Sequence, residues 1–198
     1  MILLPCDIML TTSPGAELSR LIRFFEQAPG KPKPLVSHAC LVVSANPDPN
    51  DPMGATIVEA EPHTVRHTIH QGYDGTDEKI CVFRPMQLTQ QQQADVLAEM
   101  NSYVGAVYGY VKLLACAGDF LMLGHDVFRR ACALNKYPIC SWEVAWAFDK
   151  VRTNYFGVSK DACEPSDIWN RIISNIGQES NIGHEFIFIW QRGNLYMP

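Results

Sequence analysis

The sequence predicts an α+β fold in which an antiparallel sheet packs against helices. Short β-rich runs separated by turn residues fill the first half of the chain, and segments with helical spacing fill most of the second half. Size is the third observation, because 198 residues with 47% apolar content can bury one substantial core but are few for two ordinary domains. We therefore expect one domain that spans residues 1–198.

The first half of the chain predicts five strands and one helix. The β-rich runs lie at residues 7–12, 35–45, 54–62, 64–72 and 78–85. Between the first two runs, apolar residues recur at helical spacing from Leu18 to Phe25, before Pro29 and Gly30 end the pattern. The turn clusters NPDPND (46–51) and DGTDE (74–78) separate later runs, so we expect an antiparallel meander.

After Pro85 the pattern becomes helical. Thr89 is a candidate N-cap for a helix in residues 90–105. Further helices are expected within residues 108–134, after Cys140 and in residues 165–174, and HEFIFIWQ (184–191) predicts a last strand.

Charge and cysteine usage exclude several classes of protein. The net charge of −5 provides no basic stripe for a phosphate backbone, so we do not expect a nucleic-acid partner. The seven cysteines contain no CxxC pair and are widely spaced, which fits neither a disulfide framework nor a zinc ribbon. A reducing compartment is the expectation.

No targeting or membrane-spanning segment is predicted. The opening MILLPCDIMLTT has no basic n-region and is interrupted by Asp7, so it predicts a strand instead of a signal peptide. The longest apolar stretch, in residues 103–124, carries Lys112, Asp119 and several glycines, too many for an uninterrupted span. We expect synthesis in the cytoplasm. Release by lysis, export by another route, carriage in a virus particle and action on a cytoplasmic substrate all stay open.

Cys140 is the candidate nucleophile. The stretch YPICSWEVAWAF (137–148) places it in the first turn of an expected helix, with Val144 and Phe148 at helical intervals behind it. The partial positive charge of a helix N-terminus lowers a cysteine pKa, and its N–H groups can hold an oxyanion. The alternative is a small buried side chain, which is the usual role of a free cysteine.

A nucleophilic cysteine needs an imidazole as its base and a group that orients the imidazole. His38 begins an apolar run, and symmetric pairing about the NPDPND turn sets it opposite Glu59. A longer loop would set His38 opposite Pro62 instead, and an odd slip would reverse the facing. A core histidine and a solvent-facing glutamate are the alternatives.

Several motifs in order resemble a known family. LPCDIMLTT, SHACLVV, IVEAEP, YGYVKLL, CSWEVAWAF and EPSDIW resemble the circularly permuted branch of the NlpC-type papain-like cysteine hydrolases over nearly the whole chain. That resemblance implies a papain-like fold with Cys140 as nucleophile, His38 as base and Glu59 as the orienting residue. It also implies that Tyr108 helps to stabilise the oxyanion, and it requires no cofactor or metal.

The resemblance implies hydrolysis of an amide bond in a peptidoglycan peptide or a related small amide. Two positions depart from the family pattern. Cys6 stands where glycine is common, and the helix reads Cys-Ser-Trp-Glu where Cys-Ser-Glu is usual, which moves the acid to Glu143. We expect a packing role for Cys6 and assign none to Glu143.

Three other functions stay open. His63, His67 and His70 would share one face of a helix and bind zinc, although Thr64, Val65, Thr68 and Ile69 favour a strand. The same fold with an inert cysteine would be a binding module. A lipid acyltransferase or thioesterase on this fold would place an acyl chain in an apolar groove, to which residues 113–123 could contribute.

Overall fold

A computed structural model of the chain describes residues 2–12, 35–61, 63–107, 140–176 and 185–193. Its strands are β1 (Ile8–Thr12), β2 (His38–Ser44), β3 (Thr56–Ala60), β4 (Thr64–Thr68), β5 (Lys79–Pro85) and β6 (Phe186–Arg192). Its helices are α2 (Ile69–Tyr73), α3 (Gln90–Ser102), α6 (Cys140–Asp149) and α7 (Pro165–Ile173), with short 3₁₀ turns η1 (Pro52–Gly54) and η2 (Lys160–Ala162). The helices expected within residues 13–34 and 108–134 lie outside these ranges.

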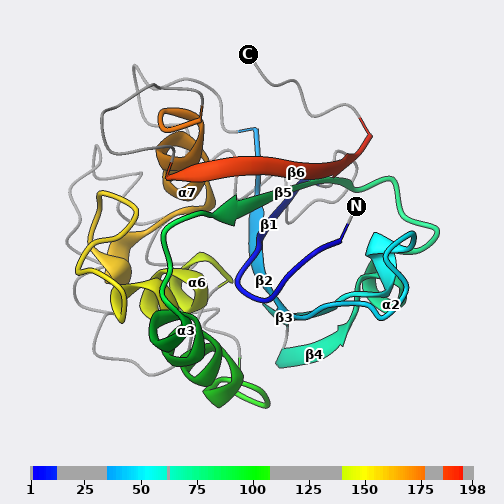
Figure 1. The fold of residues 1–198 in the computed structure, drawn as a ribbon, viewed down its shortest axis with the longest axis horizontal. Coiled ribbons are helices and arrows are strands. Elements are labelled where there is room, and N and C mark those ends of the chain that lie inside the picture. Colours follow the sequence, from blue (N-terminus) through cyan, green and yellow to red (C-terminus); the bar gives the residue numbers. More distant parts are fainter. Residues whose placement is uncertain (1, 13–34, 62, 108–139, 177–184, 194–198) are drawn as a thin grey trace.

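All six strands form one antiparallel sheet in the order β4-β3-β2-β1-β5-β6 (Figure 1). Strands β1 to β4 form the expected meander. Strand β5 does not continue it, because β5 crosses back and pairs with β1, with Met9 opposite Val82. The α+β class with an antiparallel sheet against helices is confirmed.

The run expected as a strand at residues 64–72 is a strand only to Thr68. Thr68 accepts a hydrogen bond from the Gln71 backbone N–H, and the Gln71 side chain accepts one from the Thr68 N–H. This capping box satisfies free N–H groups at a helix start and therefore ends β4 and begins α2. Thr89 caps α3 in the same way with Gln92, as the sequence predicted.

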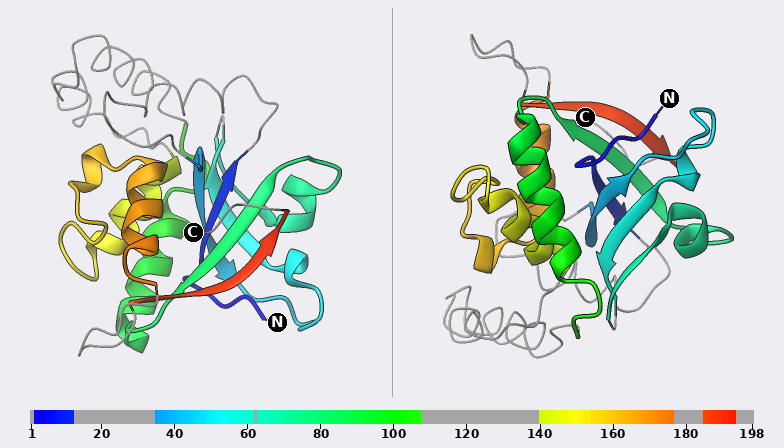
Figure 2. Two further views of the ribbon diagram at one scale, coloured as in Figure 1. Left: turned by 90° about the horizontal axis from the view of Figure 1, so that it is seen from above. Right: turned by 60° about the horizontal axis from the view of Figure 1, so that its bottom comes forward.

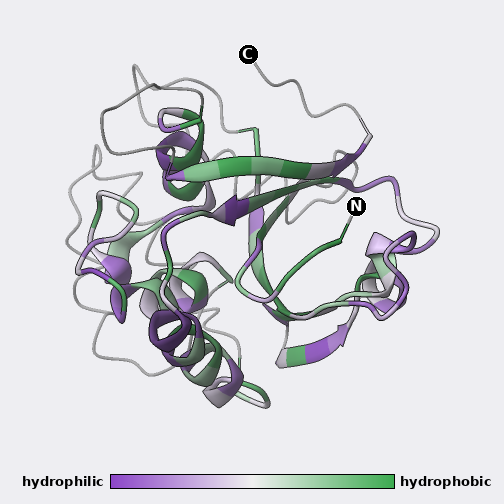
Figure 3. Cartoon of the chain, in the orientation of Figure 1, coloured by the Kyte–Doolittle hydropathy of each residue, from purple (hydrophilic) through white to green (hydrophobic). Residues whose placement is uncertain are grey.

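The sheet is covered on both faces. Figure 2 shows α3, α6 and α7 on one side and α2 on the other. Two clusters of buried apolar residues follow, one between the sheet and α3, α6 and α7, and one on the α2 side that includes Met9, Ile57 and Tyr73. Hydrophobic residues run through the central strands in Figure 3, while the first turns of α3 are hydrophilic. Burial of this apolar surface is the main driving force for the arrangement.

The start of the chain is fixed by a buried ion pair. Asp7 is fully buried, and the Arg84 guanidinium donates to both of its oxygens from Nε and Nη2, at 2.7 and 2.8 Å. Cys6 beside it is also buried and has a positive φ of 73°. Backbone of this kind favours glycine. Cys6 therefore places a side chain in a left-handed backbone conformation as well as in the core.

None of the helices in the described ranges combines the length and the apolar character that crossing a bilayer requires.

Candidate active site

The first residue of α6 is Cys140, and its side chain is buried. Helix α6 packs against β2 and β3, with Val144, Ala147 and Phe148 fully buried in the main core. The Ser141 hydroxyl donates to the Cys163 carbonyl at 2.7 Å, which ties the first turn to the segment before α7. Packing and this hydrogen bond therefore fix the position of the Cys140 thiol at the edge of the sheet.

His38, at the start of β2, lies beside the Cys140 side chain and interacts with it electrostatically. Burial alone would raise the pKa of the Cys140 thiol, but the interaction with His38 and the N–H groups of Ala39 and Ser141 outweigh burial and lower that pKa. Burial likewise opposes the charged form of His38, while Cys140 and Glu59 raise the pKa of His38 well above its ordinary value. The two shifts describe one interaction, and their direction favours a thiolate paired with an imidazolium.

Glu59 in β3 accepts three hydrogen bonds. His38 Nε2 and the Tyr73 hydroxyl both lie 2.6 Å from Oε2, and His67 Nε2 lies 2.6 Å from Oε1. The side chain of Glu59 is only 2% exposed, and burial disfavours its charge, yet these donors outweigh burial and lower the pKa of Glu59. Glu59 is thus an ionised carboxylate, and the His38 nitrogen left to face Cys140 is Nδ1.

The pairing of β2 with β3 differs from the predicted register. Leu41 lies opposite Val58 and Val42 opposite Ile57. Extended by three residues from Leu41, this register sets His38 opposite position 61, two residues from Glu59, so His38 reaches the carboxylate diagonally. The shift is even and leaves both side chains on the same face of the sheet. Next to the turn, Ser44 lies opposite Thr56, one residue beyond this register, because η1 lengthens the connecting loop on its β3 side. A bulge between Val42 and Ser44 then moves the register back by one residue, so that the net shift is even.

Two of the three side chains that donate hydrogen bonds to Glu59 were not among the expected site residues. His67 was assigned to the zinc alternative, and Tyr73 was assigned no role. The sequence could have predicted the contact of His67 with Glu59 from the strand character of residues 64–68. A strand paired with β3 brings Val65 opposite Glu59, and His67, two residues further on, then lies on the same face of the sheet. The contact of Tyr73 with Glu59 depends on the turn of the chain into α2, which the sequence pattern did not predict.

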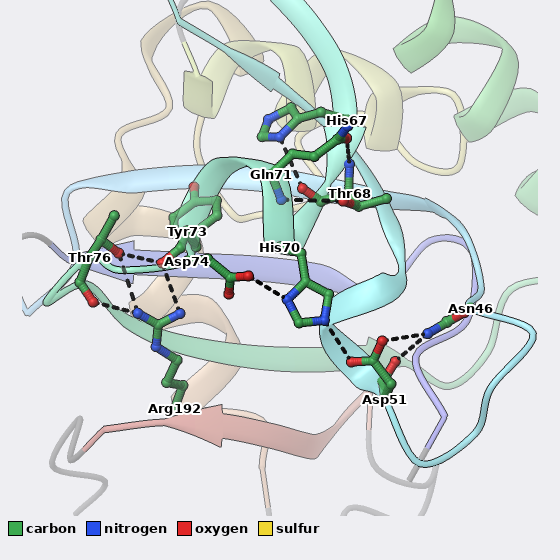
Figure 4. Close-up of polar contacts among 10 residues, drawn as sticks. All are labelled: Asn46, Asp51, His67, Thr68, His70, Gln71, Tyr73, Asp74, Thr76 and Arg192. Carbon is green, nitrogen blue, oxygen red and sulfur yellow. Dashed lines mark hydrogen bonds and ion pairs between the residues drawn. The ribbon is translucent and has the colours of Figure 1, made fainter.

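Figure 4 shows how α2 is held in place. The His70 ring bridges two carboxylates, with Nδ1 2.8 Å from Asp74 and Nε2 3.0 Å from Asp51. Arg192 of β6 donates to the carbonyls of Tyr73 and Thr76. These contacts anchor both ends of α2 to the rest of the fold, so that the Tyr73 side chain is held against Glu59.

The acid one turn beyond the cysteine, Glu143, is fully buried. Its Oε1 accepts a hydrogen bond from the Thr64 hydroxyl, and its Oε2 has no hydrogen-bond partner. Burial raises the pKa of Glu143 to about 7, against the smaller lowering effects of Thr64 and His38. Glu143 therefore does not lie at the site mouth. The Glu143 carboxyl points into the core, and the charges of His38 and Glu59 affect its pKa.

The structure does not bring the three expected zinc ligands together. His67 contacts Glu59, His70 contacts Asp51 and Asp74, and His63 pairs through its backbone with Val107. Within the described part of the chain, metal-ligand spacing is found once, at His38, Cys40 and Glu59.

That group fits a metal poorly. Both Glu59 oxygens already accept hydrogen bonds, and burial raises the pKa of the Cys40 thiol well above its ordinary value. A coordinating cysteine must lose its proton. The donor set is therefore better explained by a hydrogen-bonded cluster around Glu59.

Of the four expected site residues, the structure brings three together, because His38 is hydrogen-bonded to Glu59 and lies beside Cys140. Tyr108 lies outside the described residues. An acceptor, an imidazole and a thiol in this order have the geometry for general-base activation of a nucleophile. No protein-family model matches the chain, and a comparison with curated proteins finds no similar sequence.

Proposed function

We propose that the chain is a cysteine hydrolase of the circularly permuted NlpC type, in which Cys140 is the nucleophile, His38 the base and Glu59 the residue that orients His38. The observation that carries this proposal is the series of contacts from the buried Glu59 through the half-buried His38 to the buried Cys140. A buried thiol without a functional partner would have a raised pKa, as Cys40 and Cys81 have.

The proposed reaction is amide hydrolysis in two steps. The Cys140 thiolate attacks the carbonyl carbon, and the His38 imidazolium gives its proton to the leaving nitrogen as the C–N bond breaks. His38, now neutral, takes a proton from water, whose oxygen attacks the thioester and releases the acid and the thiolate. N–H groups in the first turn of α6 have no carbonyl within the helix and are suited to hold the oxyanion.

The substrate class follows from the family resemblance, which favours a peptide of peptidoglycan or a related small amide. Acyl transfer to or from a lipid is the second candidate. It is favoured by Val104 and Val107, two exposed valines in the segment that pairs with the start of β4. Thr64 in that strand contacts Glu143, one turn from Cys140, so an apolar chain on these valines would lie beside the site.

The test is the iodoacetamide labelling rate of each cysteine in the folded protein from pH 5 to 9, mapped by mass spectrometry, in wild type and in His38→Ala. Below its ordinary pKa, we expect Cys140 to label on the order of tenfold to a hundredfold faster than a normal thiol of equal access, and His38→Ala to abolish this advantage. Cys40 and Cys81 are internal references. A Cys140 that stays inert in wild type while the fold is intact would overturn the proposal in favour of a binding module.

A competition experiment separates the substrate classes. Protection of Cys140 by a synthetic peptidoglycan peptide supports the amidase, and protection by a short-chain lipid but not the peptide supports acyl transfer. Cys140→Ala should abolish turnover of the protecting compound and leave the circular dichroism spectrum unchanged.

A further inference from the structure

We infer that His67 is a positioning residue of the site, held as an imidazolium between Glu59 and the Thr68 carbonyl so that it fixes and charge-balances the carboxylate that orients His38. This inference rests on the proposed function of Cys140. It concerns a second histidine that does not touch the thiol and acts only through Glu59.

The hydrogen bonds of the His67 ring carry the assignment. Nδ1 lies 3.0 Å from the Thr68 carbonyl oxygen, and Nε2 lies 2.6 Å from Glu59 Oε1. A carbonyl and an ionised carboxylate can only accept, so both ring nitrogens must donate, and a ring with two N–H groups is the cation. The hydrogen bond to Glu59 is also the main cause that raises the pKa of His67, against a smaller effect of burial.

The fold leaves dedicated space for this ring. A Cβ added at Gly72 in α2 would lie 2.3 Å from His67 Cε1, closer than side chains approach one another. Residue 72 is thus limited to glycine by the ring itself, because its backbone has no positive φ that would require glycine. In Figure 4 the ring of His67 lies above α2, next to the Thr68 and Gln71 capping box.

With His67 charged, the site contains two anions and two cations. Cys140 thiolate and Glu59 are balanced by His38 and His67, and each histidine nitrogen lies 2.6 Å from the shared carboxylate. The neighbouring titratable groups are Glu61, which faces His67, and Glu143, Cys40 and Tyr73, which face His38 and Glu59. Because a nearby cation favours loss of a proton, removal of the His67 charge should raise the pH at which the Cys140–His38 ion pair forms.

The two histidine nitrogens on Glu59 are at most about 7 Å apart, a separation at which one unit charge shifts a neighbour's pKa by roughly one unit. His67→Gln keeps a donor for Glu59 but loses the charge. We therefore expect the Cys140 labelling profile to keep its maximum within about threefold and to move up by about one pH unit. His67→Ala loses the donor as well, and we expect its maximum rate to fall by about tenfold or more, since misplacement of a catalytic group is costly.

Gly72→Ala tests positioning without a change in any titratable group. The new methyl must displace the His67 ring, so its labelling profile should match His67→Ala. Gly157→Ala is the control for a glycine replacement outside the site, because Gly157 is exposed and a Cβ there meets nothing within 4 Å, so its labelling should follow wild type. His63→Gln is the control for loss of a histidine outside the site, because His63 is exposed and makes no contact with Glu59.

Nitrogen-15 NMR of the wild-type rings at pH 7 gives a readout that does not depend on Cys140. We expect both His67 nitrogens to be protonated, and a neutral ring would overturn the inference. If Cys140 is activated in wild type but His67→Gln and Gly72→Ala both superimpose on it, the inference fails and the proposed function stands. If Cys140 is inert in wild type, the proposed function fails and the positioning role fails with it, while the NMR result still decides the charge of His67.

Discussion

Replacement of Glu59 by glutamine should destabilise the protein by several kcal/mol. The carboxylate is 2% exposed and accepts from His38, His67 and Tyr73 at 2.6 Å each. A hydrogen bond to a charged group contributes about 1.5–3 kcal/mol, and the amide of glutamine keeps a single acceptor oxygen for three donors. Part of the loss is recovered if a histidine gives up its proton, so we expect a decrease of about 3–5 kcal/mol in the free energy of unfolding.

The effect has a defined pH dependence. The folded-state pKa of Glu59 lies below its ordinary value of 4.5, so the stability that its charge contributes is present above pH 4.5 and is lost as pH falls further. The pKa values of His38 and His67 are raised in the folded protein. The stability that these two histidines contribute is therefore present below about pH 6.5 and is lost as pH rises through their folded-state pKa values. The difference in the free energy of unfolding between wild type and Glu59→Gln should therefore be largest near pH 6 and should decrease toward pH 3.

Urea unfolding followed by circular dichroism at pH 3 to 8 measures this difference, and cysteine labelling reports the site in the same samples. Cys140 should lose its fast labelling in Glu59→Gln. Asp77→Asn is the control, because Asp77 is exposed and makes no contact with Glu59 or with the histidines beside it. A loss of less than about 1 kcal/mol at pH 6, with unchanged Cys140 labelling, would refute the reasoning that Glu59 holds three donors as a buried anion.

The remaining predictions concern three buried positions. The raised pKa of Glu143, about 7 against 4.5, means that wild-type stability falls as pH rises from 4.5 to 7, so Glu143→Gln should gain up to about 3 kcal/mol on wild type above pH 7 in urea titrations and nothing at pH 4. Asp7→Asn should cost about 3 kcal/mol in the same assay because it breaks the paired hydrogen bonds of Arg84, whereas the exposed Asp48→Asn should cost under 0.5 kcal/mol, and equal losses would contradict the role of the pair. Cys6→Gly should change the free energy of unfolding by less than about 1 kcal/mol, because relief of the positive φ offsets the loss of the buried side chain. Cys6→Val should lower the free energy of unfolding by more than about 2 kcal/mol, and equal values for the two variants would count against backbone strain at Cys6.

Local pattern was sufficient for much of the fold. Alternating and β-branched runs identified the strands, and Thr89 identified the start of α3, because these signals depend on neighbours a few residues apart. The same holds for Cys140 at the start of α6, where the helical spacing of Val144 and Phe148 predicted the burial observed. His38 and Glu59 were also within reach of pattern, since a hairpin with an even register error still places both on one face.

The sequence by itself therefore predicted most of the strands and helices and named Cys140, His38 and Glu59 as the candidate site. The tertiary structure decided which of them meet. The diagonal contact from His38 to Glu59 depends on the loop length at η1 and the bulge in β2, and the approach of Tyr73 depends on the capping box at α2. The return of β5 to pair with β1 and the approach of His67 to Glu59 depend on how the strands pair. These contacts join segments far apart in the chain, and their stability comes from shared burial of charge and apolar surface that no local window contains.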